Sequence, residues 1–285
     1  MLPRSRLTLL VLMATVGLSA LAGCAVNPVT GQRELVLISQ DQEIAMGNEA
    51  APEFEKEFGG RVPNETVQAY VSRVGQRLAG VSDRPMPYTY TLVSSKVPNA
   101  FALPGGNIFI TAGLMKAMTN ERQLAAVLGH ETGHVAARHS VQQMQKQMGA
   151  QLLVEIASRA GSGEGGTGAA GDVAKIVSSM ALLKYSRSDE YQADELGIKY
   201  AAQAGYNPWG MVELLQVLNS LHDKEPGRFD ELFQTHPLSS NRIDRARTIL
   251  TEEPVYKGRF SGDTPDPNRA TFGQMQQLLN KTLGE

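Results

Sequence analysis

The sequence predicts an α+β fold that is mainly helical, with a small antiparallel sheet beside a central helix. Three observations support this prediction. Apolar residues recur at helical spacing in several segments, above all in the run from Asn120 to Val141. Residues 88–94 alternate and are rich in Tyr, Thr and Val, which is typical of a strand. Residues 99–110 combine two strand-like runs with a Pro-Gly-Gly-Asn turn, which indicates a hairpin.

The first 23 residues have the layout of a secretory signal peptide. Arg4 and Arg6 precede an uncharged apolar stretch from Leu7 to Gly23. The stretch is slightly short for a membrane span and no stop-transfer pattern follows it, so an uncleaved anchor is the alternative. We expect residues 1–23 to be removed.

Cys24 comes next and is the only cysteine of the chain. Leu21-Ala22-Gly23-Cys24 resembles the lipobox of bacterial lipoproteins, in which the leader is cut before the cysteine and the cysteine is lipidated. A lone cysteine forms no internal disulfide, and an exposed thiol in an oxidising compartment would be a liability. We therefore expect a lipid anchor at Cys24 and a tether over residues 24–39. In a Gram-negative host this implies the periplasmic face of the outer membrane, and in another host an exported, membrane-anchored protein.

The composition is that of an ordinary globular protein, with 42% hydrophobic and 20% charged residues. Without residues 1–23 the chain loses two of its 27 basic residues and none of its 29 acidic ones, which leaves a formal net charge of −4. There is no basic stripe and no nucleic-acid-binding motif, so we expect no nucleic-acid partner. No second run is long and uncharged enough to span a bilayer, so the body should be soluble and tethered.

Two helices are expected before the strands, and both are interpreted as helices that cover the core. The first runs from Gln40 to Phe58 and ends at Gly59-Gly60. Asn64 is a good N-cap for the second, which extends through Leu78. Its apolar residues follow helical spacing: Val67, Tyr70, Val71, Val74 and Leu78.

Pro98 and Pro104 place the hairpin of residues 99–110 at the edge of the sheet, because proline cannot donate to a strand ladder. An edge strand can bind an extended peptide by strand addition. Asn99, Ala100 and Phe101 are therefore candidate substrate-binding residues, and a purely structural hairpin is the alternative.

The central run, capped by Asn120, contains the H-E-x-x-H motif His130-Glu131-Thr132-Gly133-His134. Histidines four apart lie one helical turn apart, so both imidazoles can reach one metal ion. Glu131 lies beside them and is badly placed as a third ligand, so it is the candidate general base for a metal-activated water. The alternative, two ordinary helix histidines, conflicts with the apolar neighbours, because unpaired polar groups are costly in a packed interior.

Zinc catalysis usually needs three protein ligands and one open position. Glu190 and Asp194 lie four apart at the start of another expected helix, so both carboxylates face one way. Small residues on that face would let it pack against Gly129 and Gly133. Glu190 is then the third ligand, and Asp194 accepts an N–H from a ligand histidine; two solvated acids are the alternative. His139 lies opposite the ligand pair on a helical wheel and is interpreted as a structural histidine.

Four separated motifs occur in the order typical of one family: Asn99-Ala100-Phe101, His130-Glu131-x-x-His134, Glu190-x-x-x-Asp194 and Thr235-His236-Pro237. From about residue 40 to about residue 250 the chain resembles the HtpX/BepA-like zinc metallopeptidases, which are gluzincins of peptidase family forty-eight. The absence of internal spans makes it similar to the lipoprotein-type periplasmic members, BepA and LoiP. The resemblance implies a zincin-type metallopeptidase domain over 40–252, followed by a C-terminal tail over 253–285 with a short helix.

The resemblance also implies an activity and further site residues. It implies a zinc endopeptidase that degrades misfolded or misassembled envelope proteins, with protein or peptide substrates and possible envelope assembly partners. In some members a later histidine occupies the open position of the zinc, which implies that role for His236; a loop-capping histidine is the alternative. Arg242 could face the cleft as an anion-stabilising donor. The rival interpretation is a chaperone-like assembly factor with a mainly structural or latent metal site. The Gly-rich segment 161–171 is expected to be a flexible loop.

Overall fold

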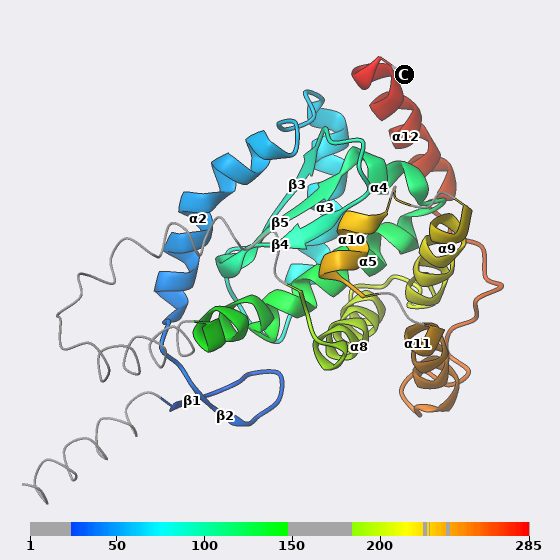
Figure 1. The fold of residues 1–285 in the computed structure, drawn as a ribbon. Coiled ribbons are helices and arrows are strands. Elements are labelled where there is room, and N and C mark those ends of the chain that lie inside the picture. Colours follow the sequence, from blue (N-terminus) through cyan, green and yellow to red (C-terminus); the bar gives the residue numbers. More distant parts are fainter. Residues whose placement is uncertain (1–23, 148–183, 225–226, 228, 238–239, 285) are drawn as a thin grey trace, which may run out of the picture.

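The computed structural model describes residues 24–147, 184–224, 227, 229–237 and 240–284. The expected signal peptide and the Gly-rich segment 161–171 lie outside these residues. Helices surround a small sheet, as the predicted α+β class requires (Figure 1). The first half of the described chain contains β1 (Cys24–Val26), β2 (Arg33–Leu35), α2 (Gln40–Glu57), α3 (Glu65–Ala79), β3 (Thr89–Val93), β4 (Ala100–Ala102), the 3-10 turn η1 (Pro104–Gly106), β5 (Asn107–Thr111), α4 (Ala112–Ala117) and α5 (Glu121–Ala136). The second half contains α8 (Arg187–Gln203), α9 (Gly210–Lys224), α10 (Asp230–Thr235), α11 (Ser240–Glu252) and α12 (Arg269–Leu283).

The three-stranded sheet has the order β3-β5-β4. β4 and β5 form the expected antiparallel hairpin, with Phe101 opposite Phe109, and β4 lies at an edge as the prolines indicate. β3 pairs with β5 in parallel, so the sheet is mixed and not antiparallel throughout. After β3 the chain passes over the position of β5 and forms β4 on the far side, running in the opposite direction. The hairpin then reverses the chain again, so β5 lies between the two strands and runs parallel to β3.

The two faces of the sheet contribute to different cores. Ala100, Ala102 and the neighbouring residues of β5 face the main core, which α3 and α5 share. Phe101 and Phe109 face the other way and stack at 5.2 Å between ring centroids. Phe54 of α2 and Phe58 just beyond it complete this aromatic cluster, so α2 covers the second face (Figure 1).

The first two helices form where the sequence predicts them. Ser39 and Gln42 make a capping box at the start of α2, and Gly59 ends it with a positive φ of 84°. The side chain of Asn64 caps α3 by accepting from two backbone N–H groups. All five predicted apolar positions of α3 are at most 2% exposed. Local capping and helical periodicity therefore determine these two elements.

Close contact between α5 and α8 depends on glycine, as expected. A Cβ on Gly129 would lie 3.2 Å from Gly197 Cα, and one on Gly133 would lie 3.0 Å from Leu196 Cβ. These distances are shorter than ordinary Cβ contacts, so the two helices can approach this closely only because glycine has no side chain. The two helices that carry the motif residues thus lie backbone against backbone (Figure 1).

Residues 24–38 do not form a free tether within the described chain. β1 and β2 pair as a hairpin, and the Asn27 side-chain amide donates to Ala137 O at the end of α5. Gln142 reaches both Glu34 and Ala137 O from beyond α5. This hairpin is therefore attached to the body next to the end of the motif helix.

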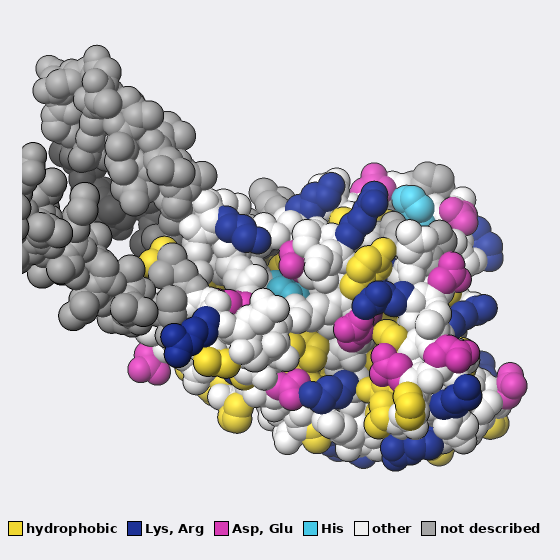
Figure 2. Space-filling model, turned by 90° about the horizontal axis from the view of Figure 1, so that it is seen from below, with side chains coloured by type: hydrophobic (Ala, Val, Ile, Leu, Met, Phe, Trp, Pro, Cys, Tyr) yellow, Lys and Arg dark blue, Asp and Glu magenta, His cyan; other side chains and the backbone are white. Residues whose placement is uncertain are grey.

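The C-terminal segment also packs against the body. α12 has 15 residues, more than the short helix expected in the tail over 253–285, and its Phe272 and Leu279 are fully buried. The Gln276 amide donates to the carbonyl oxygens of Met115 and Met118. On the face shown in Figure 2, basic and acidic side chains are interspersed. Within the described residues, no helix has both the length and the apolar character needed to cross a membrane.

Candidate metal centre and active site

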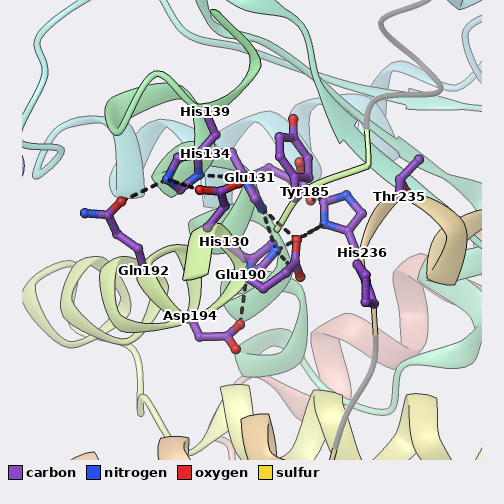
Figure 3. Close-up of polar contacts among 12 residues, drawn as sticks. His130, Glu131, His134, His139, Tyr185, Glu190, Gln192, Asp194, Thr235 and His236 are labelled. Atoms are coloured by element: carbon purple, nitrogen blue, oxygen red, sulfur yellow. Dashed lines mark hydrogen bonds and ion pairs between the residues drawn. The ribbon is translucent and has the colours of Figure 1, made fainter. Parts of the chain in front are cut away.

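α5 carries the motif through the centre of the protein. Asn120 caps its first turn, and every one of its residues is buried. His130 is 5% exposed, Glu131 1% and His134 0%. Buried polar side chains on an apolar helix need partners, and α8 supplies them through Glu190, which is 1% exposed (Figure 3).

The donor atoms of four buried residues converge on one point. His130 Nε2 lies 3.0 Å from His134 Nε2, and Glu190 oxygens lie 3.4 Å from His134 Nε2 and 3.6 Å from His130 Nε2. His236 Nδ1 lies 3.4 Å from His130 Nε2 and 3.0 Å from Glu190 Oε1. Four ligands at about 2.0–2.1 Å from a tetrahedral zinc ion would lie about 3.3–3.4 Å apart. The spacing of these donors therefore fits a tetrahedral metal site.

The partner behind His130 tests this fit independently, and the partner behind His134 is compatible with it. His130 Nδ1 lies 3.0 Å from Asp194 Oδ1, so it carries the hydrogen and leaves a lone pair on Nε2. His134 Nδ1 lies 2.9 Å from His139 Nδ1, so one of these nitrogens donates and the other accepts, and a metal ion on His134 Nε2 would require the hydrogen on His134 Nδ1. Burial lowers the pKa of His134 well below its ordinary value, so the ring is neutral. The lone pair of His130 Nε2 thus faces His134 Nε2 at 3.0 Å beside the Glu190 carboxylate, an arrangement that a bound cation would satisfy.

Glu131 lies beside these donors without joining them. Burial raises its pKa above the ordinary value for a glutamate. Its Oε2 has no hydrogen-bond partner among the described residues, and its Oε1 lies 3.7 Å from His236 Nε2. A raised pKa and an unpaired oxygen suit a general base that accepts and returns a proton near neutral pH.

Arg242 contacts acids rather than open space. Its guanidinium donates to both carboxylate oxygens of Asp194, at 2.8 and 2.7 Å, and Nη1 lies 2.6 Å from Glu190 Oε2. Burial raises the pKa of the Asp194 carboxyl, but the charge of Arg242 outweighs this and holds the pKa below its ordinary value. Arg242 is expected from the sequence to face the cleft, and in the structure it lies beside the donor cluster with its N–H groups facing Glu190 and Asp194.

His139 is not where the helical wheel places it. A continuous helix would separate His134 and His139 by about 140° around its axis. α5 instead ends at Ala136, and Arg138 takes a left-handed φ of 63° before a new helical stretch begins at His139. The break turns His139 back toward His134. No local pattern in the sequence marks it, since arginine is not a residue that favours this conformation.

Tyr185 is a further site residue that the sequence interpretation missed. Its ring stacks on His134 with centroids 3.9 Å apart, and its hydroxyl lies 2.9 Å from Ser140 Oγ. Its backbone N–H donates to Thr235 O at 3.1 Å, which holds the segment that carries His236. Figure 3 shows Tyr185 between the motif helix and this segment.

The edge strand β4 lies against α5. Leu103 N–H donates to Asn107 O and Thr111 N–H to Asn99 O, so residues 99, 101 and 103 bond to β5. The backbone groups of Ala100 and Ala102 consequently point away from β5. Ala100 is 0% exposed and Ala102 7%, so the body of the protein covers these groups, and the Phe101 side chain belongs to the aromatic cluster.

An apolar cavity of about 30 Å³ adjoins the donor cluster. Its polar wall consists of His130, Glu131, His236 and Arg242. The rest of its lining is aliphatic or aromatic: Leu114, Val127, Met211, Leu214, Leu215, Leu218, Leu232 and Phe233. A cavity beside the candidate general base with this lining suits an apolar side chain.

Comparison with known proteins agrees with this geometry. The family model described as "Peptidase family M48" matches residues 65–250. The chain is 29% identical over 255 residues to the mitochondrial metalloendopeptidase OMA1 of Schizosaccharomyces pombe, covering 88% of this chain and 72% of the relative. It is 29% identical over 250 residues to the beta-barrel assembly-enhancing protease of Yersinia pestis, covering 83% of this chain and 49% of the relative. With the metalloprotease YcaL of Escherichia coli it shares 31% identity over 182 residues, 62% of this chain and 70% of the relative.

The chain spans about half the length of the beta-barrel assembly-enhancing proteases that it matches. The matched region contains both the motif helix α5 and the helix α8 that faces it. The family match and the convergence of His130, His134, Glu190 and His236 lead to one conclusion. The chain is a metalloprotease and belongs to peptidase family M48.

Proposed function

We propose that this metalloprotease is a zinc-dependent endopeptidase of the bacterial cell envelope that acts on misfolded or misassembled envelope proteins. The observation that carries the proposal is the closure of His130, His134 and Glu190 around one point with Glu131 beside it. Imidazole nitrogens and one carboxylate are a ligand set that zinc favours in hydrolytic enzymes, although other divalent ions accept it too. Zinc there would polarise the scissile carbonyl and activate water.

The residues of the chain then have distinct roles. Glu131 takes a proton from the attacking water and later gives it to the leaving amine. Asp194 accepts a hydrogen bond from His130 Nδ1–H and so fixes the orientation of the His130 ring, and Arg242 holds Asp194 and Glu190 in place. We therefore assign Arg242 a positioning role in place of the anion-stabilising one suggested by the sequence.

The edge of β4 supports binding of an extended polypeptide. The backbone groups of Ala100 and Ala102 are directed away from β5 and would pair with a substrate strand once the groups that bury both residues move aside. Strand pairing reads the backbone and not the side chains, so it suits a protease whose substrates share an unfolded state. The apolar cavity would take an apolar side chain next to the scissile bond. Such side chains are buried in folded proteins and become accessible on misfolding.

His236 supports a resting state in which the protease is blocked. Its Nδ1 lies 3.4 Å from His130 Nε2 and 3.0 Å from Glu190 Oε1, the separations expected between ligands of one metal ion. It would therefore occupy the coordination position that a substrate or water needs. The same four-donor arrangement supports the second candidate, a chaperone-like or assembly factor of the outer membrane with a latent metal site, because structural zinc sites are four-coordinate.

The proposed location follows from the sequence alone. Residues 1–23 would direct export, and a lipid on Cys24 would attach the protein to the periplasmic face of the outer membrane in a Gram-negative host. The hairpin of residues 24–35 would then hold the catalytic body close to the anchored end.

Casein cleavage tests the function, with zinc content measured on the same samples of wild type, Glu131→Gln and His236→Ala. Wild type or His236→Ala should cleave, and Glu131→Gln should bind zinc without cleaving. The matched control for His236→Ala is His222→Ala, which changes an exposed histidine at the end of α9. Higher activity for His236→Ala alone would identify the block. No cleavage by any zinc-loaded variant would refute the peptidase proposal in favour of the latent site.

A further inference from the structure

His139 and Gln192 continue the hydrogen-bond chain that starts at His134. His139 Nδ1 lies 2.9 Å from His134 Nδ1, and His139 Nε2 lies 2.9 Å from Gln192 Oε1 (Figure 3). His139 is 2% exposed, so water does not substitute for these partners. Neither residue belongs to the donor cluster, and the function proposed above uses neither.

The direction of each hydrogen bond follows from the donor cluster. His134 Nε2 faces His130 and Glu190, so its lone pair is directed there and the hydrogen is on Nδ1. His139 Nδ1 must then accept, which places the His139 hydrogen on Nε2. Gln192 Oε1 is an acceptor and receives it. Each link therefore has one possible polarity once the metal donor is fixed.

We propose that His139, oriented by Gln192, is a positioning residue that fixes the tautomer and ring orientation of the metal donor His134. The inference rests on the proposed metal centre but does not require that the protein cleaves peptides. It means that the two motif histidines have different partners. A carboxylate supports His130 and a neutral imidazole supports His134, so the second ligand is held in position without added negative charge.

Contacts from other segments of the chain hold His139 in this position. The turn at Ala137 and Arg138, which aims His139 inward, is held from outside α5. The Arg138 guanidinium donates to Ile38 O and pairs with the buried Glu43. The Asn27 amide donates to Ala137 O. The N-terminal segment and α2 thus stabilise the conformation that places His139 against His134.

Zinc affinity measured by chelator competition tests the proposal without reference to activity. Loss of a partner behind a metal-ligand histidine typically weakens metal binding about 10- to 100-fold, and we expect this for His139→Ala. His139→Gln should bind zinc to within about threefold of wild type, because its carbonyl can accept from His134 Nδ1–H. The control His222→Gln, at an exposed histidine, should leave affinity unchanged.

A second variant avoids any folding defect of the buried substitution. Gln192 is half-buried, and Gln192→Leu removes the acceptor within hydrogen-bond distance of His139 Nε2, since the Asp189 carboxylate lies farther away at 3.9 Å. His139 can then carry its hydrogen on Nδ1 and oppose His134 Nδ1–H, so zinc affinity should fall severalfold. Imidazole nitrogen NMR of the zinc-loaded protein should show one His134 tautomer in wild type and His139→Gln. In Gln192→Leu, the His139 ring should show a mixture of tautomers.

The outcomes separate this inference from the proposed function. If the protein holds zinc but cleaves nothing, the peptidase proposal fails, while weakened zinc binding in His139→Ala still supports the positioning role. If His139→Ala and Gln192→Leu both bind zinc as wild type does, with the His139 tautomer unchanged, the positioning role is overturned. A wild-type protein that binds no zinc overturns both.

Discussion

Substitution of Gly197 by alanine should lower the stability and zinc affinity of the protein, although Gly197 is not itself a candidate metal ligand. A Cβ at this position would lie 3.0 Å from His130 N and 3.3 Å from Gly129 C, both backbone atoms of α5. The nearby Met211 Cε, at 2.7 Å, is the end of a flexible side chain and can move. The backbone cannot, so α5 and α8 must separate by about 0.4 Å to reach ordinary contact distance.

The magnitude combines two opposing terms. Overpacking of a closely packed contact costs about 1–3 kcal/mol. Replacement of a helical glycine by alanine returns about 0.5–1 kcal/mol. We expect a net destabilisation of about 1–2 kcal/mol, and so a melting temperature lower by about 2–8 °C. Zinc affinity should fall as well, because α8 carries Glu190 and α5 carries His130.

Gly273→Ala is the matched control, since a Cβ there meets nothing within 4 Å and the residue also lies in a helix, α12. It should raise the melting temperature, because only the helix-propensity term acts. Both variants are measured by circular dichroism melts with chelator and with zinc, and by zinc competition. If Gly197→Ala is stabilised like Gly273→Ala and binds zinc like wild type, the close backbone packing does not position the site.

Three further predictions concern the charges, the ion and the cavity. Arg242→Leu leaves Asp194 and Glu190 without their guanidinium and should cost about 3–5 kcal/mol; a thermal melt within 2 °C of wild type, a tolerance of about 1 kcal/mol, would contradict this. Removal of zinc with a chelator should lower the unfolding free energy by about 2.7 kcal/mol relative to zinc at 100 times its dissociation constant, and identical melts with and without chelator would show that the ion does not bind the folded state. Leu215→Trp fills the cavity and should reduce cleavage next to bulky apolar residues by roughly 10-fold or more relative to small ones; an unchanged preference across a peptide series would exclude the cavity as a subsite.

Local patterns were sufficient for much of the site. The spacing of His130, His134, Glu190 and Asp194 predicts which side chains share a helix face, since helical geometry alone decides this. The glycines at 129 and 133 indicate a close helix neighbour, and the structure confirms that α8 is that neighbour. The shared helix faces depend on residues one turn apart, whereas the contact between α5 and α8 depends on small residues on both helices.

Other features depend on contacts between distant segments. The break before His139 is held by Glu43, almost a hundred residues earlier, so a helical wheel cannot reveal it. The parallel pairing of β3 with β5 depends on which side of the hairpin β3 approaches. The direction of Arg242 depends on the carboxylates of α8. In each case the sequence names the residue but tertiary contacts determine its partner.

The packing of α12 has a consequence for the order in which the protein can fold. The Asn64 amide at the start of α3 donates to Thr282 at a sequence separation of 218 residues, and the Phe272 ring lies tilted against Tyr70 with centroids 6.4 Å apart. The main core therefore closes around a helix that leaves the ribosome after all the other described helices. Long-range contacts of this kind form late, because the intervening chain must first be ordered. We expect a nascent chain to remain open until residue 282 has emerged, which delays assembly of a working protease until synthesis has passed that point.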